Sequence, residues 1–102
     1  MAISNTVLTT TPTAIYTSSG SSVVTLLYFC NTSGSSKTVD VYLVPNGGSA
    51  TSATQIYKAY TITSSDTLVV DKEKIILDNG DAIFASANAN TSITTTVGYT
   101  AL

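Results

Sequence analysis

Short runs in which apolar and polar residues alternate make up most of this chain, and such alternation is typical of β-strands. The longest apolar run, residues 23–30, is apolar at both alternating sets of positions, so we expect this strand to be covered on both faces. One set is Val23, Leu27 and Phe29, and the other is Val24, Leu26, Tyr28 and Cys30. The next run, residues 39–44, is apolar on one face only. We interpret the two runs, with the polar loop between them, as a β-hairpin at the centre of a sheet.

Further strands are predicted wherever alternation resumes between turn residues. These strands cover residues 13–17, 55–62, 67–71, 75–77, 82–86 and 92–100. Asn79 and Gly80 stand between two of them and can supply the tight turn of a hairpin. Because no segment has a 3.6-residue apolar period of helical length, we predict an all-β, antiparallel two-sheet β-sandwich of about seven to nine short strands. Jelly-roll-like and immunoglobulin-like strand orders both remain open.

The first residues of the chain are patterned only weakly. Ile3, Val7 and Leu8 stand among serine, asparagine and threonine, so we expect residues 1–12 to form an extended N-terminal arm or an edge strand rather than a core element. Pro12 ends this segment, because proline interrupts regular structure. Residues 13–102 are then expected to form a single β-sandwich domain, since a chain of 102 residues supports one hydrophobic core.

Charge is scarce in this chain. Charged residues make up 10% of it, the formal net charge is −2 and arginine is absent, whereas 19 threonines and 14 serines are present. About 25% charge is usual in soluble domains. A surface with so little charge protects weakly against association, so we expect assembly with copies or partners. The four lysines cannot neutralise a useful run of phosphates, which argues against nucleic-acid binding.

No segment of the chain is typical of membrane insertion or secretion. No apolar run approaches the roughly 20 residues of a transmembrane helix. The first five residues have neither a basic region nor a long apolar region, so we expect no signal peptide. We therefore expect no membrane contact, and a chain that stays in the cell that makes it until it is carried out.

Few side chains in the chain can titrate or attack a substrate. Histidine is absent and there is one cysteine, Cys30, which excludes Ser-His-Asp and Cys-His sites and histidine-based metal sites. We expect Cys30 to be a buried small side chain, because it ends an apolar strand. Carboxylates at turns are common for backbone reasons, so we predict no catalytic, cofactor or metal residues. The alternative is a calcium ion at turn oxygens without EF-hand spacing, from Asp78, Asn79 and Asp81 or from Asp66 and Asp71.

Tyrosine is the one residue type that suggests a binding role. The six tyrosines are Tyr16, Tyr28, Tyr42, Tyr57, Tyr60 and Tyr99. Tyrosine packs sheets, and it is also favoured at protein interfaces and in sugar sites, because it combines a flat apolar ring with a polar tip. Three interpretations stay open: sheet packing, a protein interface, or a glycan site at the loops of residues 31–36 and 45–54.

Four segments together resemble a known group of proteins. They are Leu27-Tyr28-Phe29-Cys30-Asn31-Thr32-Ser33, Val41-Tyr42-Leu43-Val44-Pro45-Asn46-Gly47-Gly48, Asp66-Thr67-Leu68-Val69-Val70-Asp71 and Leu77-Asp78-Asn79-Gly80-Asp81-Ala82-Ile83-Phe84-Ala85. This pattern of turns and strand edges is similar to that of small β-sandwich virion structural proteins of tailed bacteriophages, cyanophages included. The resemblance covers roughly residues 13 to 100.

The resemblance implies a non-enzymatic virion component, assembled in the host cytoplasm. Its simplest form is a capsid decoration (cement) protein, often trimeric, that binds the major capsid protein lattice. The alternative is a tail, neck, baseplate or fibre component, which can also bind a host-surface glycan. Other virion proteins are then its partners, alongside copies of itself. The residues expected in such interfaces are Ile3, Val7, Leu8, Tyr16, Tyr42 and Tyr57.

Overall fold

The computed structural model describes residues 2–70 and 75–102, and these residues form β-strands and turns without any helix. The strands are β1 (Ala2–Val7), β2 (Thr13–Thr17), β3 (Ser22–Asn31), β4 (Lys37–Val44), β5 (Gln55–Ile62), β6 (Thr67–Val70), β7 (Ile75–Leu77), β8 (Ala82–Ala87) and β9 (Ile93–Ala101). The last residue of the strand expected at residues 67–71 lies outside the described residues. No helix in the described ranges is long and apolar enough to cross a membrane.

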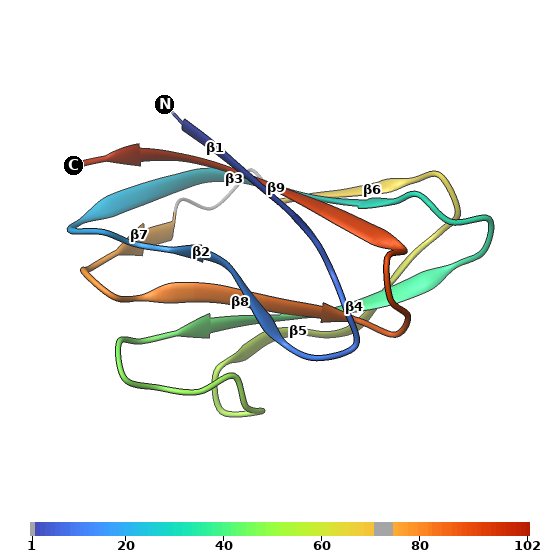
Figure 1. Ribbon diagram of the computed structural model, residues 1–102, viewed down its shortest axis with the longest axis horizontal. Coiled ribbons are helices and arrows are strands. Elements are labelled where there is room, and N and C mark those ends of the chain that lie inside the picture. Colours follow the sequence, from blue (N-terminus) through green and yellow to red (C-terminus); the bar gives the residue numbers. More distant parts are fainter. Residues whose placement is uncertain (1, 71–74) are drawn as a thin grey trace.

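The strands form two antiparallel sheets that face each other, as the sequence predicts (Figure 1). Sheet A has the order β1-β9-β3-β6, and β7 pairs with β3 beyond the end of β6. Sheet B has the order β2-β8-β4-β5. The upper layer in Figure 1 is sheet A and the lower layer is sheet B. The fold is therefore a β-sandwich.

The strand order is that of a jelly roll. Four nested antiparallel pairs run from the ends of the chain to its middle: β1 with β9, β2 with β8, β3 with β6 and β7, and β4 with β5. Successive pairs alternate between the sheets, as if one long hairpin had been rolled up. In an immunoglobulin order the first and last strands lie in different sheets. Here β1 and β9 are neighbours in sheet A, which separates the two alternatives.

The hydrophobic core fills the space between the sheets. Its largest members from sheet A are Leu27, Phe29 and Ile93, and Ile83 faces them from sheet B. Each of these side chains is essentially inaccessible to water. A buried aliphatic or aromatic side chain of this size contributes about 1.5–3 kcal/mol of transfer free energy. The side chains that point inward thus hold the two sheets together.

The predicted central hairpin is wrong. β3 and β4 lie in different sheets, so residues 32–36 connect the layers instead of joining two paired strands. The predicted hairpin at Asn79 and Gly80 is also wrong, because β7 pairs with β3 in sheet A and β8 lies in sheet B. Gly80 has φ +86°, a backbone conformation that favours glycine. The turn therefore needs this glycine, but it connects the two sheets instead of two paired strands. β4 and β5 are consecutive strands that do pair with each other.

The predicted faces are confirmed in two strands and corrected in a third. The alternation in the sequence predicts that Val39 and Val41 share one face of β4 and that Ile93 and Val97 share one face of β9. All four side chains are buried. In β3 the register against β9 shifts between Val24 and Leu26. This bulge turns Val24 inward with Leu27 and Phe29, although strict alternation places Val24 with Leu26.

Candidate interaction surface

The side of sheet A that faces away from sheet B carries a row of apolar side chains across four strands. Ile3 and Val7 lie on β1, Leu26, Tyr28 and Cys30 on β3, Val69 on β6 and Ile76 on β7, with Asn5, Thr94 and Thr96 between them. Strand register brings them together, because Tyr28 pairs with Thr96 on one side and Val69 on the other. We call these ten residues the apolar outer face.

Much of the apolar outer face is accessible to water. The exposed fraction is 67% for Ile3, 50% for Val7, 37% for Tyr28, 45% for Val69 and 70% for Ile76. Single exposed apolar side chains are ordinary, whereas a group of them on one face marks an interaction site. These five are most of the eight large hydrophobic residues that are exposed in the described part of the chain.

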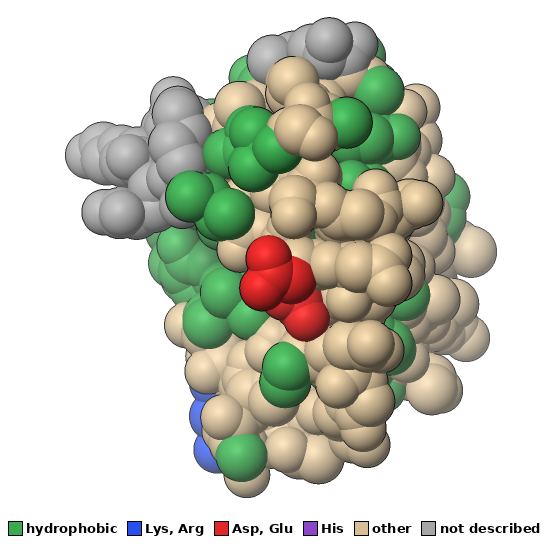
Figure 2. Space-filling model, turned by 90° about the vertical axis from the view of Figure 1, so that its left-hand side faces the viewer, with side chains coloured by type: hydrophobic (Ala, Val, Ile, Leu, Met, Phe, Trp, Pro, Cys, Tyr) green, Lys and Arg blue, Asp and Glu red, His purple; other side chains and the backbone are tan. Residues whose placement is uncertain are grey.

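No charge interrupts this surface within the described strands. The residues of β1, β3, β6, β7 and β9 include no aspartate, glutamate or lysine. Figure 2 shows the end of the molecule where β1 begins and β9 ends: most of its atoms are uncharged, with one acidic group near the middle and a few lysine atoms at the lower left edge. Removing such a face from water therefore carries little cost of charge desolvation.

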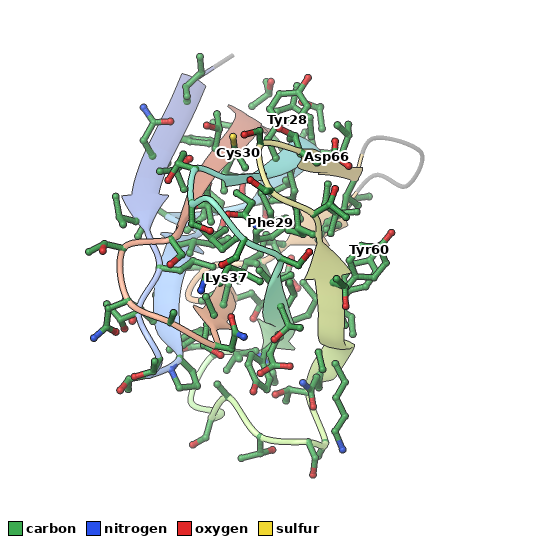
Figure 3. The ribbon with its side chains drawn as sticks, turned by 90° about the vertical axis from the view of Figure 1, so that its right-hand side faces the viewer. Tyr28, Phe29, Cys30, Lys37, Tyr60 and Asp66 are labelled. Carbon is green, nitrogen blue, oxygen red and sulfur yellow. The ribbon has the colours of Figure 1, made fainter. Side chains whose placement is uncertain are left out.

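β3 shows most clearly that the outer face lacks a cover within the described chain. Phe29 points between the sheets and is fully buried, whereas Tyr28 and Cys30 point the other way (Figure 3). The prediction that both faces of this strand are covered is wrong for the single chain, since Tyr28 is exposed and Cys30 only half-buried. A strand apolar on both faces is typical of a sheet covered on both sides. The sequence of β3 thus suits a partner on the outer face.

Sheet B differs from sheet A in its charge and regularity. Lys37 and Asp40 lie on β4 and Lys58 on β5. The Asp40 carboxylate accepts hydrogen bonds from the Ala59 backbone N–H, at 2.6 Å, and from the Gln55 amide, at 3.2 Å. These bonds hold β5 in the irregular course that its register shifts against β4 describe. The charge and the irregular edge make this side a poorer docking surface.

The structure separates the three predicted interface residues of the N-terminal segment. Ile3 and Val7 lie on the apolar outer face, but Leu8 is fully buried in the core. The Leu8 N–H donates to the Ile93 carbonyl at 2.8 Å, which continues the pairing of β1 with β9. Residues 2–8 are therefore an edge strand whose last residue is anchored in the core, and Leu8 is corrected from interface to core.

The three predicted interface tyrosines lie away from the apolar outer face. Tyr16 packs against Tyr99, with 4.3 Å between ring centroids, and its hydroxyl donates to Ser22 Oγ at 3.0 Å. Tyr57 packs against the core beside Tyr60. Tyr42 is half-buried on sheet B, where it pairs with Phe84. For these three the sheet-packing interpretation fits better.

Sequence reasoning missed three of the five exposed apolar residues of the apolar outer face: Tyr28, Val69 and Ile76. Each lies in a run that is apolar at both alternating sets of positions. Such a run predicts burial of both faces, so the pattern does not show which face is exposed. One signal was available. The runs now seen as sheet A carry no charge, whereas those of β4 and β5 in sheet B do.

The turn carboxylates serve the backbone. Asp81 accepts hydrogen bonds from the Asn46 N–H at 2.9 Å and the Asp78 N–H at 3.0 Å. Asp66 accepts one from the Thr67 N–H at 2.8 Å. Across residues 2–70 and 75–102, no group of three or more histidine, cysteine or acidic side chains could hold a metal ion. Asp71, the second half of one calcium alternative, lies outside the described residues.

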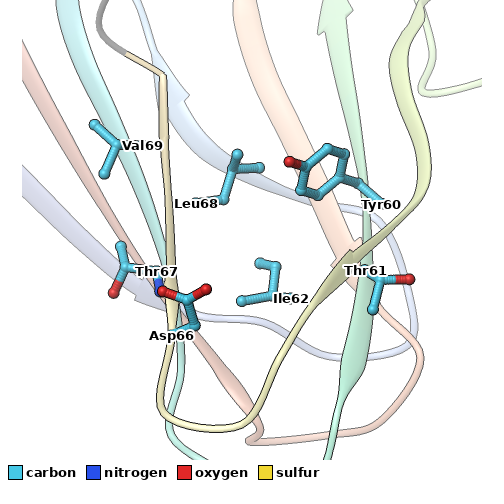
Figure 4. A pocket seen from close by; sticks show the side chains of 7 residues that line it. All are labelled: Tyr60, Thr61, Ile62, Asp66, Thr67, Leu68 and Val69. Carbon is cyan, nitrogen blue, oxygen red and sulfur yellow. The ribbon is translucent and has the colours of Figure 1, made fainter.

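The hollows of the surface are shallow. One lies between β5 and β6, at the open side of the sandwich, and has a volume of about 180 Å³ (Figure 4). Tyr60, Ile62 and Leu68 line it beside Asp66. Binding sites for drug-sized ligands usually exceed about 300 Å³, and this hollow is smaller. A more open hollow of about 360 Å³ lies along β1 and β9, between residues 5–7 and 94–96. Asn31, in one of the two loops considered for glycan contact, is fully buried, so its side chain cannot contact a glycan.

Comparisons with known proteins identify no relative. No protein-family model, no curated protein and no solved structure matches this chain.

Proposed function

We propose that this chain is a non-enzymatic structural protein of a tailed-bacteriophage virion that docks through its apolar outer face. In the simplest form it is a cement protein on the lattice of the major capsid protein, put together with the particle in the host cytoplasm. The observation that carries the proposal is the open side of β3, where Tyr28 is exposed in a strand that is apolar on both faces. A surface of this kind suits permanent coverage.

Two further observations support a structural role. Jelly rolls occur in viral capsid proteins, although they also occur in lectins and cupins, so the fold by itself does not decide the function. The turn and strand-edge segments resemble small virion proteins of tailed phages.

The alternative of a tail, neck, baseplate or fibre component uses the same face against a different lattice. Its glycan-binding form has less support, because Asn31 is buried and none of the six tyrosines stands in residues 31–36 or 45–54. Gold labelling of intact virions distinguishes a capsid location from a tail location.

Gold labelling of intact virions tests the proposal. An antibody raised to this chain is applied to particles from cells that carry its gene, and electron microscopy scores head, neck, tail and tip. The cement role predicts dense labelling over the head. Labelling confined to the tail or its tip replaces cement by the tail role, and virions without any label overturn the virion proposal. A pre-immune serum is the control.

A further inference from the structure

Among the edge strands of the two sheets, β1 is the one that nothing in the described chain protects from pairing with another strand. Natural edge strands are blunted by bulges, charge, proline or shortness. β5 has two register shifts, Lys58, and Ala59 at φ 49°. β2 follows Pro12 and has a register shift against β8, while β6 and β7 are only four and three residues long.

β1 itself is regular. Its six residues, Ala-Ile-Ser-Asn-Thr-Val, include no charge, proline or glycine. They pair with β9 in unbroken register from Ala2 opposite Tyr99 to Val7 opposite Thr94. The order of sheet A leaves the other side of β1 without a neighbouring strand among the described residues. An uncharged, regular edge of this length can act as a template for another strand.

The backbone groups at this free edge belong to alternate residues. The Leu8 N–H donates to the Ile93 carbonyl, and the Leu8 carbonyl accepts from the Thr91 N–H at 3.1 Å, so Leu8 faces β9. In an antiparallel ladder the N–H and C=O of one residue point to the same side and alternate along the strand. Ser4 and Thr6 therefore also face β9. The N–H and C=O groups of Ile3, Asn5 and Val7 face outward from the edge.

We propose that β1 pairs antiparallel with β1 of a second copy of this chain, with the two-fold axis at Asn5. In this register Ile3 lies opposite Val7 of the second copy, and Asn5 lies opposite its own equivalent. All three residues with outward backbone groups then form hydrogen-bonded pairs. The same register puts the two exposed apolar side chains of β1 beside each other on the outer face.

Other registers satisfy fewer of these groups. A shift by one residue sets Ile3 opposite a residue whose backbone groups already bond to β9, and it also mismatches inward and outward side chains. A shift by two residues sets Ile3 opposite Asn5, and the Val7 side chain of each copy then loses its apolar partner. The register centred on Asn5 is the one that both pairs the outward backbone groups and places Ile3 beside Val7.

The proposed pair has a definite architecture. A two-fold contact uses the same surface on both copies and closes at two, so we propose a dimer, whereas the cement proteins that the chain resembles are often trimers. Two five-stranded sheets become one of ten strands, and their apolar outer faces become continuous. The proposal does not depend on the virion role, because it rests on β1 alone.

Sedimentation of purified protein tests the pairing. We expect wild type at twice the mass of the chain. Asn5→Pro removes an N–H that faces the free edge, in both copies, and leaves the backbone bonds to β9 intact. The substitution also removes the exposed hydrogen bond that Asn5 Oδ1 accepts from the Thr96 hydroxyl at 3.1 Å. We expect this variant to dimerise at least about tenfold more weakly with an unchanged circular dichroism spectrum. Val7→Lys should act likewise, and Val69→Lys, the same change on the opposite edge of the face, should stay dimeric.

Disulfide trapping tests the register. In Cys30→Ser protein, Asn5→Cys should give covalent dimers under mild oxidation, because paired Cα atoms lie about 5.5 Å apart and a disulfide spans about 4.4–6.8 Å. Thr96→Cys is the matched control, because Thr96 on β9 pairs with Asn5. It should cross-link poorly, since the β1 strands of both copies lie between the two cysteines. A wild type that stays monomeric at high concentration overturns the proposal. So does a trimer, or a dimer that Val7→Lys leaves intact and that the Asn5→Cys substitution fails to trap.

Discussion

The Asn31 side-chain amide donates a hydrogen bond to the Ile62 backbone carbonyl at 2.9 Å and so ties sheet A to sheet B. The same amide nitrogen donates to the Ser35 carbonyl at 2.9 Å. Its Oδ1 accepts from the Ser33 N–H and hydroxyl, at 2.9 and 2.7 Å. Asn31 is fully buried, and every polar group of its side chain is bonded. One residue thus fixes the end of β3, the loop after it and the end of β5.

We expect Asn31→Ala to lower the free energy of unfolding by about 2–4 kcal/mol, because it leaves the buried Ile62 carbonyl without its partner and removes three other bonds. Chemical denaturation measures the change. Asn90→Ala is the matched control: Asn90 Oδ1 accepts one exposed bond, from the Thr10 N–H at 3.0 Å, so its loss should cost less than about 1 kcal/mol. Equal effects at the two positions would contradict the role of Asn31.

The turn between β2 and β3, which carries the chain from sheet B to sheet A, makes a second prediction. Gly20 has φ +72°, and a Cβ added there meets no atom within 4 Å. Gly20→Ala should therefore cost about 1–2 kcal/mol from backbone strain alone. Gly34 is equally open but has no positive φ, so Gly34→Ala should be neutral or slightly stabilising. Thermal unfolding of the pair measures the difference, and a destabilised Gly34→Ala would refute this explanation.

Local signals in the sequence predict the strands and the sandwich. Alternation and turn residues act over a few neighbours, and they give all nine strands to within a few residues. Pairing depends on which distant strands meet, and in a jelly roll most consecutive strands lie in opposite sheets. Turn composition is similar whether a turn joins paired strands or crosses between layers. That similarity explains why the residues at Asn79 and Gly80 predict a hairpin that the fold does not contain.

The candidate surface is predictable from the sequence only at its edge. Ile3 and Val7 stand out because their neighbours are polar, whereas Leu8 directly after Val7 must point inward by alternation. The bulge between Val24 and Leu26 reverses which alternating residues of β3 point inward. No residue type in this segment predicts a bulge. Tyr28 is hidden by the apolar residues on both sides of it. Whether such a strand is covered by its own chain or by a partner cannot be read from its apolarity.

Charge on the apolar outer face should prevent docking without unfolding the chain. We expect Tyr28→Lys to lower binding to isolated virions or empty capsids at least about tenfold, because burying an unpaired charge is costly. Co-sedimentation with the particles measures the loss. Tyr60→Lys is the matched control, since Tyr60 is comparably exposed, at 44%, but lies on β5 in sheet B. If Tyr60→Lys abolishes binding and Tyr28→Lys does not, docking uses the other sheet.

The single cysteine can report whether the outer face is covered in the particle. Cys30 lies on that face, where Thr94 of β9 stands between it and Val7 of β1. Because Cys30 is only half-buried, a small maleimide should label it in the free protein. We expect the labelling rate to fall at least about tenfold when the chain is bound to virions, because a docked partner excludes the reagent. Mass spectrometry after timed labelling gives both rates. The control is Cys30→Ser with Thr61→Cys, an exposed position on β5, whose rate should change little. A Cys30 rate that is the same in free and bound protein would show that docking leaves the face open, and it would remove the main support for the proposed interface.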